Sequence, residues 1–77
     1  MAGREKFEIL ALAHLDAVYR AAYALSGRSH EAEELSQTTF TKALERFDSF
    51  AEGTNCRAWL LRILRNTWFD RLRHRKV

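Results

Sequence analysis

The sequence predicts an all-α fold, a compact domain of three helices. Its 77 residues contain no proline and three glycines, and 47% of them are hydrophobic. Alanine, leucine, glutamate and arginine, which favour helices, are abundant. Apolar residues recur at steps of three and four, which is the period of a helix with one buried face. A chain of this length forms a single small domain, so residues 1–77 are expected to share one core.

The first helix is expected over residues 5–26, after a disordered end at residues 1–4. Its apolar face comprises Phe7, Leu10, Leu15, Val18, Ala22 and Leu25. Gly27 follows, and glycine readily adopts the left-handed conformation that ends many helices. Ser29 stands where a serine commonly caps the next helix.

The second helix is expected over residues 29–47. Its apolar face comprises Ala32, Leu35, Thr39, Phe40, Ala43, Leu44 and Phe47. The opposite face carries Glu33, Glu34, Gln37, Thr38, Thr41, Lys42 and Glu45. Glutamates in the first turns of a helix are favoured by its macrodipole, so a solvated acidic face is one sufficient explanation of this pattern.

Residues 48–55 interrupt the helical period and predict a loop, which leads into a last helix over residues 56–76. One face of that helix comprises Trp59, Leu60, Ile63, Leu64 and Thr67. Cys56 is expected to be a small buried residue rather than a redox sensor. Trp68 and Phe69 are adjacent, so at most one of them can face the core. Phe50, in the loop, could pack on the core or meet a ligand.

The last helix carries most of the positive charge. From Arg57 onward there are seven basic residues and one acid, whereas residues 1–55 hold six basic residues and nine acids. Trp59, Trp68 and Phe69 are interleaved among the arginines. Guanidinium groups pair with phosphates and aromatic faces stack on bases, so this helix is a candidate for binding a nucleic acid with unpaired bases. We nevertheless expect Trp59, on the apolar face, to lie in the core.

Several function classes lack their motifs. The sequence has no glycine-rich phosphate loop, HExxH pair or Cys-x-x-Cys, and its three histidines are scattered. No enzymatic activity, metal site or cofactor is therefore predicted. No apolar run approaches the roughly 18 residues of a membrane span, and no signal pattern begins the chain. With a single cysteine, a reducing compartment is the default, and a cytoplasmic protein without a membrane partner is expected.

Two blocks of sequence resemble region 2 of bacterial sigma factors of the extracytoplasmic-function group. EELSQTTFTKALERFDSF is similar to an acidic-Leu-x-Gln helix that ends in Arg-Phe-x-x-Phe, and AWLLRILRN is similar to Ala-Trp-Leu-x-Arg-Ile-x-x-Asn. They occur in the family's order with the family's loop length, and with the preceding helix the resemblance covers nearly the whole chain. It implies a transcription initiation module, and a fragment of a factor whose second domain reads the −35 element. The EGTN loop resembles the branch tied to redox or general stress.

The resemblance implies that the second helix docks on the clamp helices of the largest subunit of core RNA polymerase. The matching residues are Glu33, Glu34, Gln37, Thr38 and Thr41. The family usually has an aliphatic residue where Ser36 stands and an acid where Thr38 stands, so weaker docking is expected. An anti-sigma protein that covers these surfaces is implied by analogy, and the domain is expected to be a monomer.

For the loop and the last helix, the resemblance implies recognition and melting of the promoter −10 element by capture of a flipped base of the non-template strand. The DNA-binding residues implied are Phe50, Gly53, Thr54, Asn55, Arg57, Arg62, Arg65, Asn66, Phe69 and Arg73. The loop residues would help build the base pocket, Asn66 would support or read base edges, and Arg57, Arg62 and Arg65 would hold phosphates. Flipping a base costs a few kcal/mol, which stacking and edge hydrogen bonds in a pocket offset.

Two other functions remain open on the sequence alone. One is a stand-alone helical module that binds nucleic acid without polymerase, for which the charge asymmetry would suffice. The other is a protein-interaction domain whose basic helix meets an acidic partner and binds no DNA. Binding to core RNA polymerase separates the sigma-factor hypothesis from both.

Overall fold

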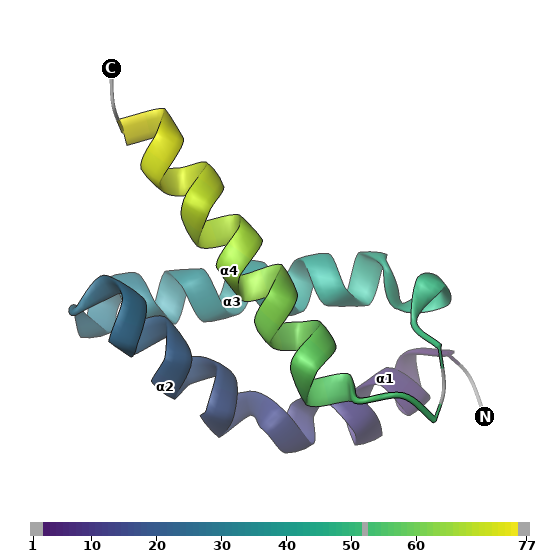
Figure 1. Cartoon of the computed structure of the whole chain (residues 1–77). Helices are drawn as coiled ribbons and strands as arrows, with labels where there is room; N and C mark the ends of the chain where they lie inside the picture. Colours follow the sequence, from purple (N-terminus) through teal and green to yellow (C-terminus); the bar gives the residue numbers. More distant parts are fainter. Residues whose placement is uncertain (1–2, 52, 76–77) are drawn as a thin grey trace.

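The structure, a computed structural model, describes residues 3–51 and 53–75 and is all-α in these residues. Its elements, in order, are α1 (Gly3–Ala11), η1 (Leu12–His14), α2 (Leu15–Ser26), α3 (Ser29–Glu45), η2 (Phe47–Ser49) and α4 (Cys56–Arg75). α3 runs alongside α2 and α1, and α4 crosses α3 diagonally while it also contacts α2 and α1 (Figure 1). None of the described helices is both long and apolar enough to span a membrane.

The first predicted helix is helical as expected but contains a short 3₁₀ turn, η1, between α1 and α2. It also begins earlier, since Gly3 and Arg4 belong to α1, while residues 1 and 2 lie outside the described part of the chain. Three residues complete one turn of a 3₁₀ helix. His14 therefore comes into line with the buried Ala11, and Leu15 is turned outward.

That turn explains why Leu15, predicted in the core, is 49% exposed. Phe7, Val18 and Ala22 are buried as predicted. Leu44 of α3 was also predicted in the core and is 38% exposed. It lines a hollow of about 250 Å³ between α3 and the residues of α1 and η1.

The connection from α2 to α3 is tight and depends on Gly27. This residue has a positive φ of 75°, and its N–H donates to the carbonyl of Tyr23 at 2.8 Å. The predicted side-chain cap at Ser29 is wrong, because α3 already begins at Ser29 and its capping residue is Arg28. The Ser26 hydroxyl instead bonds to the backbone of Arg28.

The core lies between α4 and the helices on which it packs. It contains Leu35 and Ala43 from α3 and Leu60 and Leu64 from α4, all fully buried. Trp68 is buried while Phe69 is 51% exposed, which confirms that one of the two faces inward. At the other end of the core, the rings of Phe7 and Phe47 meet edge to face with centroids 5.4 Å apart. α4 is thereby held along most of its length, with one side left to solvent.

Candidate functional site

The loop before α4 is fixed by hydrogen bonds at its end. Asn55 caps α4, because its side-chain oxygen Oδ1 accepts from the N–H of Ala58 at 3.0 Å. The N–H and hydroxyl of Thr54 both donate to the carbonyl of Ala51. Gly53 adopts a φ of 85°, which residues with a Cβ rarely do. The cap leaves the amide NH₂ of Asn55 as a donor for a ligand.

An aromatic cluster joins this loop to α4. The ring of Phe50 stacks on that of Phe47 with centroids 5.8 Å apart, and lies 4.9 Å from the ring of Trp59. Phe50 and Trp59 are both half-buried. Much of the surface of each ring is therefore covered by packing within the protein. Phe50 holds the loop against the start of α4.

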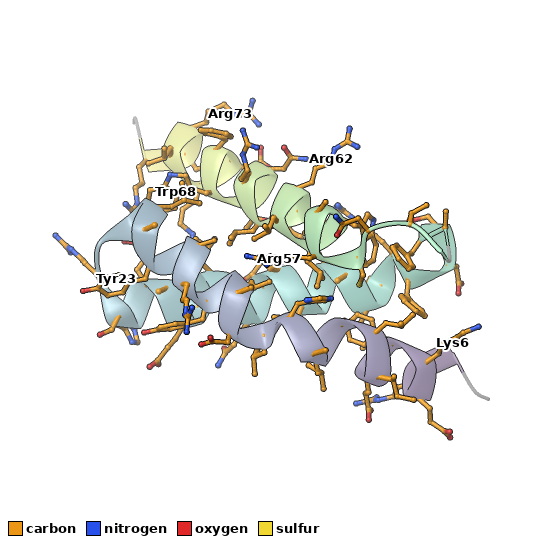
Figure 2. All side chains as sticks on the ribbon, turned by 60° about the horizontal axis from the view of Figure 1, so that its bottom comes forward. Lys6, Tyr23, Arg57, Arg62, Trp68 and Arg73 are labelled. Carbon is orange, nitrogen blue, oxygen red and sulfur yellow. The ribbon has the colours of Figure 1, made fainter. Side chains whose placement is uncertain are left out.

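The solvent side of α4 brings four of the predicted DNA-binding residues together. Arg62, Arg65, Asn66 and Phe69 line a hollow of about 230 Å³, called here the α4 pocket. All four are exposed, and Phe69 presents half of its ring to solvent. Figure 2 shows Arg62, and Arg73 farther along the helix, pointing away from α2 and α3. This pocket combines cations, an amide and an aromatic face.

Arg57 is separated from that group. It lies on the α2 side of α4 (Figure 2), where it lines another hollow of about 510 Å³ with Asp16 and Arg20. Arg62 lies five positions after Arg57, and a step of five does not keep two side chains on one face of an α-helix. A ligand in the α4 pocket would not reach it directly.

The arginines near the end of α4 are engaged within the protein. Arg73 donates to the Asp70 carboxylate. Arg75 donates to Glu31 of α3, and its guanidinium lies 5.8 Å from the centre of the Trp68 ring. Arg71 lies 3.8 Å from Glu31 and 3.9 Å from Glu34. The predicted DNA contact at Arg73 would therefore compete with Asp70.

Two basic residues at the C-terminal end of α3, one in its last turn and one at its C-cap, were not predicted to bind DNA. Lys42 and Arg46 lie beside α4 and line a hollow of about 560 Å³ with Asn66, Phe69 and Arg73, called here the α3/α4 groove. The available signal was their spacing of four residues just before the loop, which places two cations on one helix face. By helical period alone, Lys42 falls on the polar face of α3 that also carries Glu33 and Glu34.

The residues predicted to bind polymerase divide between two sides of α3. Glu33 and Gln37 rim a largely apolar hollow of about 430 Å³ beside Leu15 and Tyr19 of α2. Thr41 lies farther along α3, where it lines a hollow with Leu12 and Leu44. The exposed residues Glu33, Gln37 and Thr41 are together called here the seam of α3. Glu34 lies toward α4, near His30 at 3.6 Å and Arg71. Thr38 is half-buried.

Ser36 and Cys56 are buried side chains. Ser36 is 6% exposed, and its hydroxyl has no hydrogen-bond partner within the described residues. Cys56 is 8% exposed, and burial raises the pKa of its thiol. A thiol with a raised pKa is a poor nucleophile, which favours packing over redox sensing. Within the described residues, no group of three or more His, Cys, Asp or Glu could hold a metal ion.

Comparison with known proteins identifies sequences similar to this chain. A family model described as Sigma-70 region 2 matches residues 10–77. The chain is 44% identical over 62 residues to the ECF RNA polymerase sigma factor SigE of Mycolicibacterium smegmatis, covering 80% of this chain and 24% of that protein. It is 38% identical over 61 residues to the ECF RNA polymerase sigma factor SigW of Bacillus subtilis, covering 79% and 33%. For the ECF RNA polymerase sigma factor EcfG of Rhodopseudomonas palustris, identity is 44% over 55 residues, covering 71% and 30%. The chain thus spans a third or less of each relative's length.

Proposed function

Because the chain belongs to the Sigma-70 region 2 family, we propose that it is a transcription initiation module that binds core RNA polymerase and the promoter −10 element. The observation that carries this proposal is the division of charge between two helices. Arg62 and Arg65 of α4 make no ion pair within the described residues, whereas the exposed seam of α3 carries Glu33. One small domain can then hold an acidic and a basic partner at once.

Polymerase binds through α3 in this proposal. Glu33 and Gln37 are exposed at the rim of an apolar hollow, so a partner can combine charge pairing with burial of Leu15. Charge pairing at such a surface mainly sets orientation and encounter rate, and apolar burial adds affinity. Thr41 and the half-buried Thr38 extend this contact, and Glu34 contributes from the side that faces Arg71.

Promoter DNA binds through the loop and α4. The α4 pocket offers the Asn66 amide for a base edge, the Phe69 ring for stacking, and Arg62 and Arg65 for phosphates. Gly53, Thr54 and Asn55 would contribute from the loop that precedes α4, which the contact between Phe50 and Trp59 holds against the start of that helix. A non-template base that leaves the duplex can thus be held by several contacts together, which offsets the cost of opening. Arg57 and Arg73 contribute to the surrounding positive field rather than to the pocket.

The chemistry of RNA synthesis belongs to the polymerase in this proposal, and the chain contributes binding. An anti-sigma protein that covers the seam of α3 or the α4 pocket would regulate it. This role would place the protein in the bacterial cytoplasm at the nucleoid, as a monomer in complex with polymerase.

The test is a pull-down of core RNA polymerase with the tagged 77-residue chain. We expect wild type to retain the polymerase and the double variant Glu34→Ala with Gln37→Ala to retain much less. Glu5→Gln, an exposed acid on α1, is the matched control, and circular dichroism melting checks that each variant is folded. If wild type retains no polymerase, or the double variant retains as much as wild type, the proposal loses its main support. Binding to DNA alone would then favour a stand-alone nucleic-acid module.

A further inference from the structure

The α3/α4 groove lies next to the α4 pocket and shares two residues with it. Asn66 and Phe69 line both hollows, so a strand that leaves the pocket past the Phe69 ring can enter the groove directly. The groove, of about 560 Å³, is the larger of the two. Its far wall is formed by the last turn of α3, the helix assigned above to the polymerase.

Lys42 is held in position at the base of this groove. Its ammonium donates a hydrogen bond of 3.0 Å to Oγ1 of Thr67. The Thr67 hydroxyl donates in turn to the carbonyl of Ile63 at 2.8 Å, so its oxygen is free to accept from Lys42. An ammonium group has three donors, and two of them remain for a ligand. The half-buried stem of Lys42 limits its movement.

Arg46 lies one helical turn beyond Lys42 and is exposed. Within residues 3–51 and 53–75, neither side chain makes an ion pair. The acid that lines the groove, Asp70, is engaged by Arg73. Two cations that have no carboxylate partner in the described part of the chain therefore line a hollow that is also lined by an aromatic ring. Such a hollow suits an anion attached to a flat apolar group.

We propose that Lys42 and Arg46 hold a backbone phosphate of a single DNA strand, next to the nucleotide whose base occupies the α4 pocket. This inference rests on the proposed function and adds α3 to the DNA-binding surface. The side of α3 that carries Glu33, Gln37 and Thr41 then serves the polymerase, and Lys42 with the capping residue Arg46 serves the DNA. The strand would pass over Phe69 between the two hollows.

The experiment measures binding of the 77-residue chain to fluorescent single-stranded oligonucleotides by anisotropy, with and without core RNA polymerase. The best-bound sequence is resynthesised with one neutral methylphosphonate linkage moved along it. Arg46→Gln and Lys42→Gln are the test variants, since glutamine removes the positive charge but keeps a polar side chain with N–H donors. Arg28→Gln, another exposed arginine that lies outside the groove, is the matched control, and Asn66→Ala reports on the α4 pocket.

We expect Arg46→Gln to lower affinity about three- to tenfold and to reduce the slope of log K against log salt by about 0.7. For wild type, the neutral linkage should lower affinity at one position, next to the nucleotide at which Asn66→Ala changes the base preference. For Arg46→Gln, the neutral linkage at that position should cause no further loss of affinity. Arg28→Gln should behave as wild type. If Arg46→Gln and Lys42→Gln bind as wild type while Asn66→Ala binds weakly, the groove proposal is wrong and the proposed function stands. If wild type binds no oligonucleotide under either condition, both are overturned.

Discussion

Arg75, in the last turn of α4, donates a hydrogen bond to the carboxylate of Glu31, in the first turn of α3. The Glu31 side chain is only 11% exposed, and Arg71 approaches the same oxygen at 3.8 Å. The ring of Trp68 lies under the Arg75 guanidinium. This cluster fastens the distal end of α4 to the start of α3.

Replacing Glu31 with glutamine should destabilise the domain. The change leaves two guanidinium groups without their shared carboxylate, and we expect a loss of about 1–2 kcal/mol, between the values for exposed and buried ion pairs. Urea denaturation followed by circular dichroism measures it. Glu33→Gln, exposed on the same helix, is the control and should unfold at nearly the wild-type urea concentration.

Asn66→Ala and Arg65→Ala should have different effects on DNA binding. Loss of the Asn66 amide should reduce the preference for one base at one position, by about 1–3 kcal/mol. Loss of Arg65 should weaken binding to all sequences and lower the salt slope by about 0.7 for single strands. Affinity for a set of oligonucleotides that vary one base at a time separates the two. An equal loss on every sequence for both variants would count against base reading by Asn66.

Asn55 has two proposed roles that one pair of substitutions can separate. Asn55→Ser keeps a side-chain oxygen that can cap α4 but removes the amide NH₂, so stability should be retained and oligonucleotide affinity should fall. Asn55→Ala removes the cap as well and should cost about 1 kcal/mol of stability. Thermal melting and anisotropy, measured on both variants, test this. Unchanged DNA affinity in Asn55→Ser would restrict Asn55 to capping.

The buried Ser36 hydroxyl should reduce the stability of the domain. An unpaired buried hydroxyl costs about 1–3 kcal/mol, and alanine removes it while keeping a small side chain with a higher helix propensity. We therefore expect Ser36→Ala to raise the free energy of unfolding by about 1 kcal/mol or more. Ser29→Ala, exposed at the start of α3, should change it by less. Urea denaturation distinguishes the two, and a destabilised Ser36→Ala would contradict the prediction.

Cys56 should react slowly with alkylating agents in the folded protein. Burial raises the pKa of its thiol, so the thiolate that reacts is scarce near neutral pH. Iodoacetamide labelling followed by mass spectrometry should be slow in buffer and fast in urea. The raised pKa means that folding favours the protonated thiol, so its contribution to stability is complete below the unfolded-state pKa and is lost as the pH rises through the folded-state pKa. Cys56→Ser should remove that loss at alkaline pH.

The three-helix fold class and the family could be predicted from the sequence, and both are confirmed. Apolar spacing identified the helices, because a buried face repeats with the helical period. The same reasoning could not find η1, since no glycine or proline marks it, and Leu15 was consequently placed on the wrong side. Helix ends were predicted to within a few residues: α3 ends at Glu45 rather than at residue 47, and the described part of α4 ends at Arg75.

Less of the candidate site could be predicted from the sequence, because the charge of a residue does not show whether an acid pairs with it in the fold. Arg73 and Arg65 were both predicted to bind DNA. In the structure Asp70 pairs with Arg73 and not with Arg65. Glu31 is nearly buried beside two arginines that lie forty or more positions along the chain, which its place in the first turn of α3 does not indicate. Lys42 became part of the site only through the packing of α3 against α4. The roles assigned to the site residues remain predictions.

Arg71 lies within 4 Å of two carboxylates, those of Glu31 and Glu34, and only Glu34 is largely exposed. A positively charged partner that engages Glu34 displaces the longer of two contacts, and Arg71 retains the other. Glu34 can thus pair with a cation of the partner in place of Arg71, while the end of α4 stays bound to Glu31. If α3 binds polymerase as proposed, binding and release at Glu34 would leave the contacts of Arg75 and Arg71 with Glu31 in place.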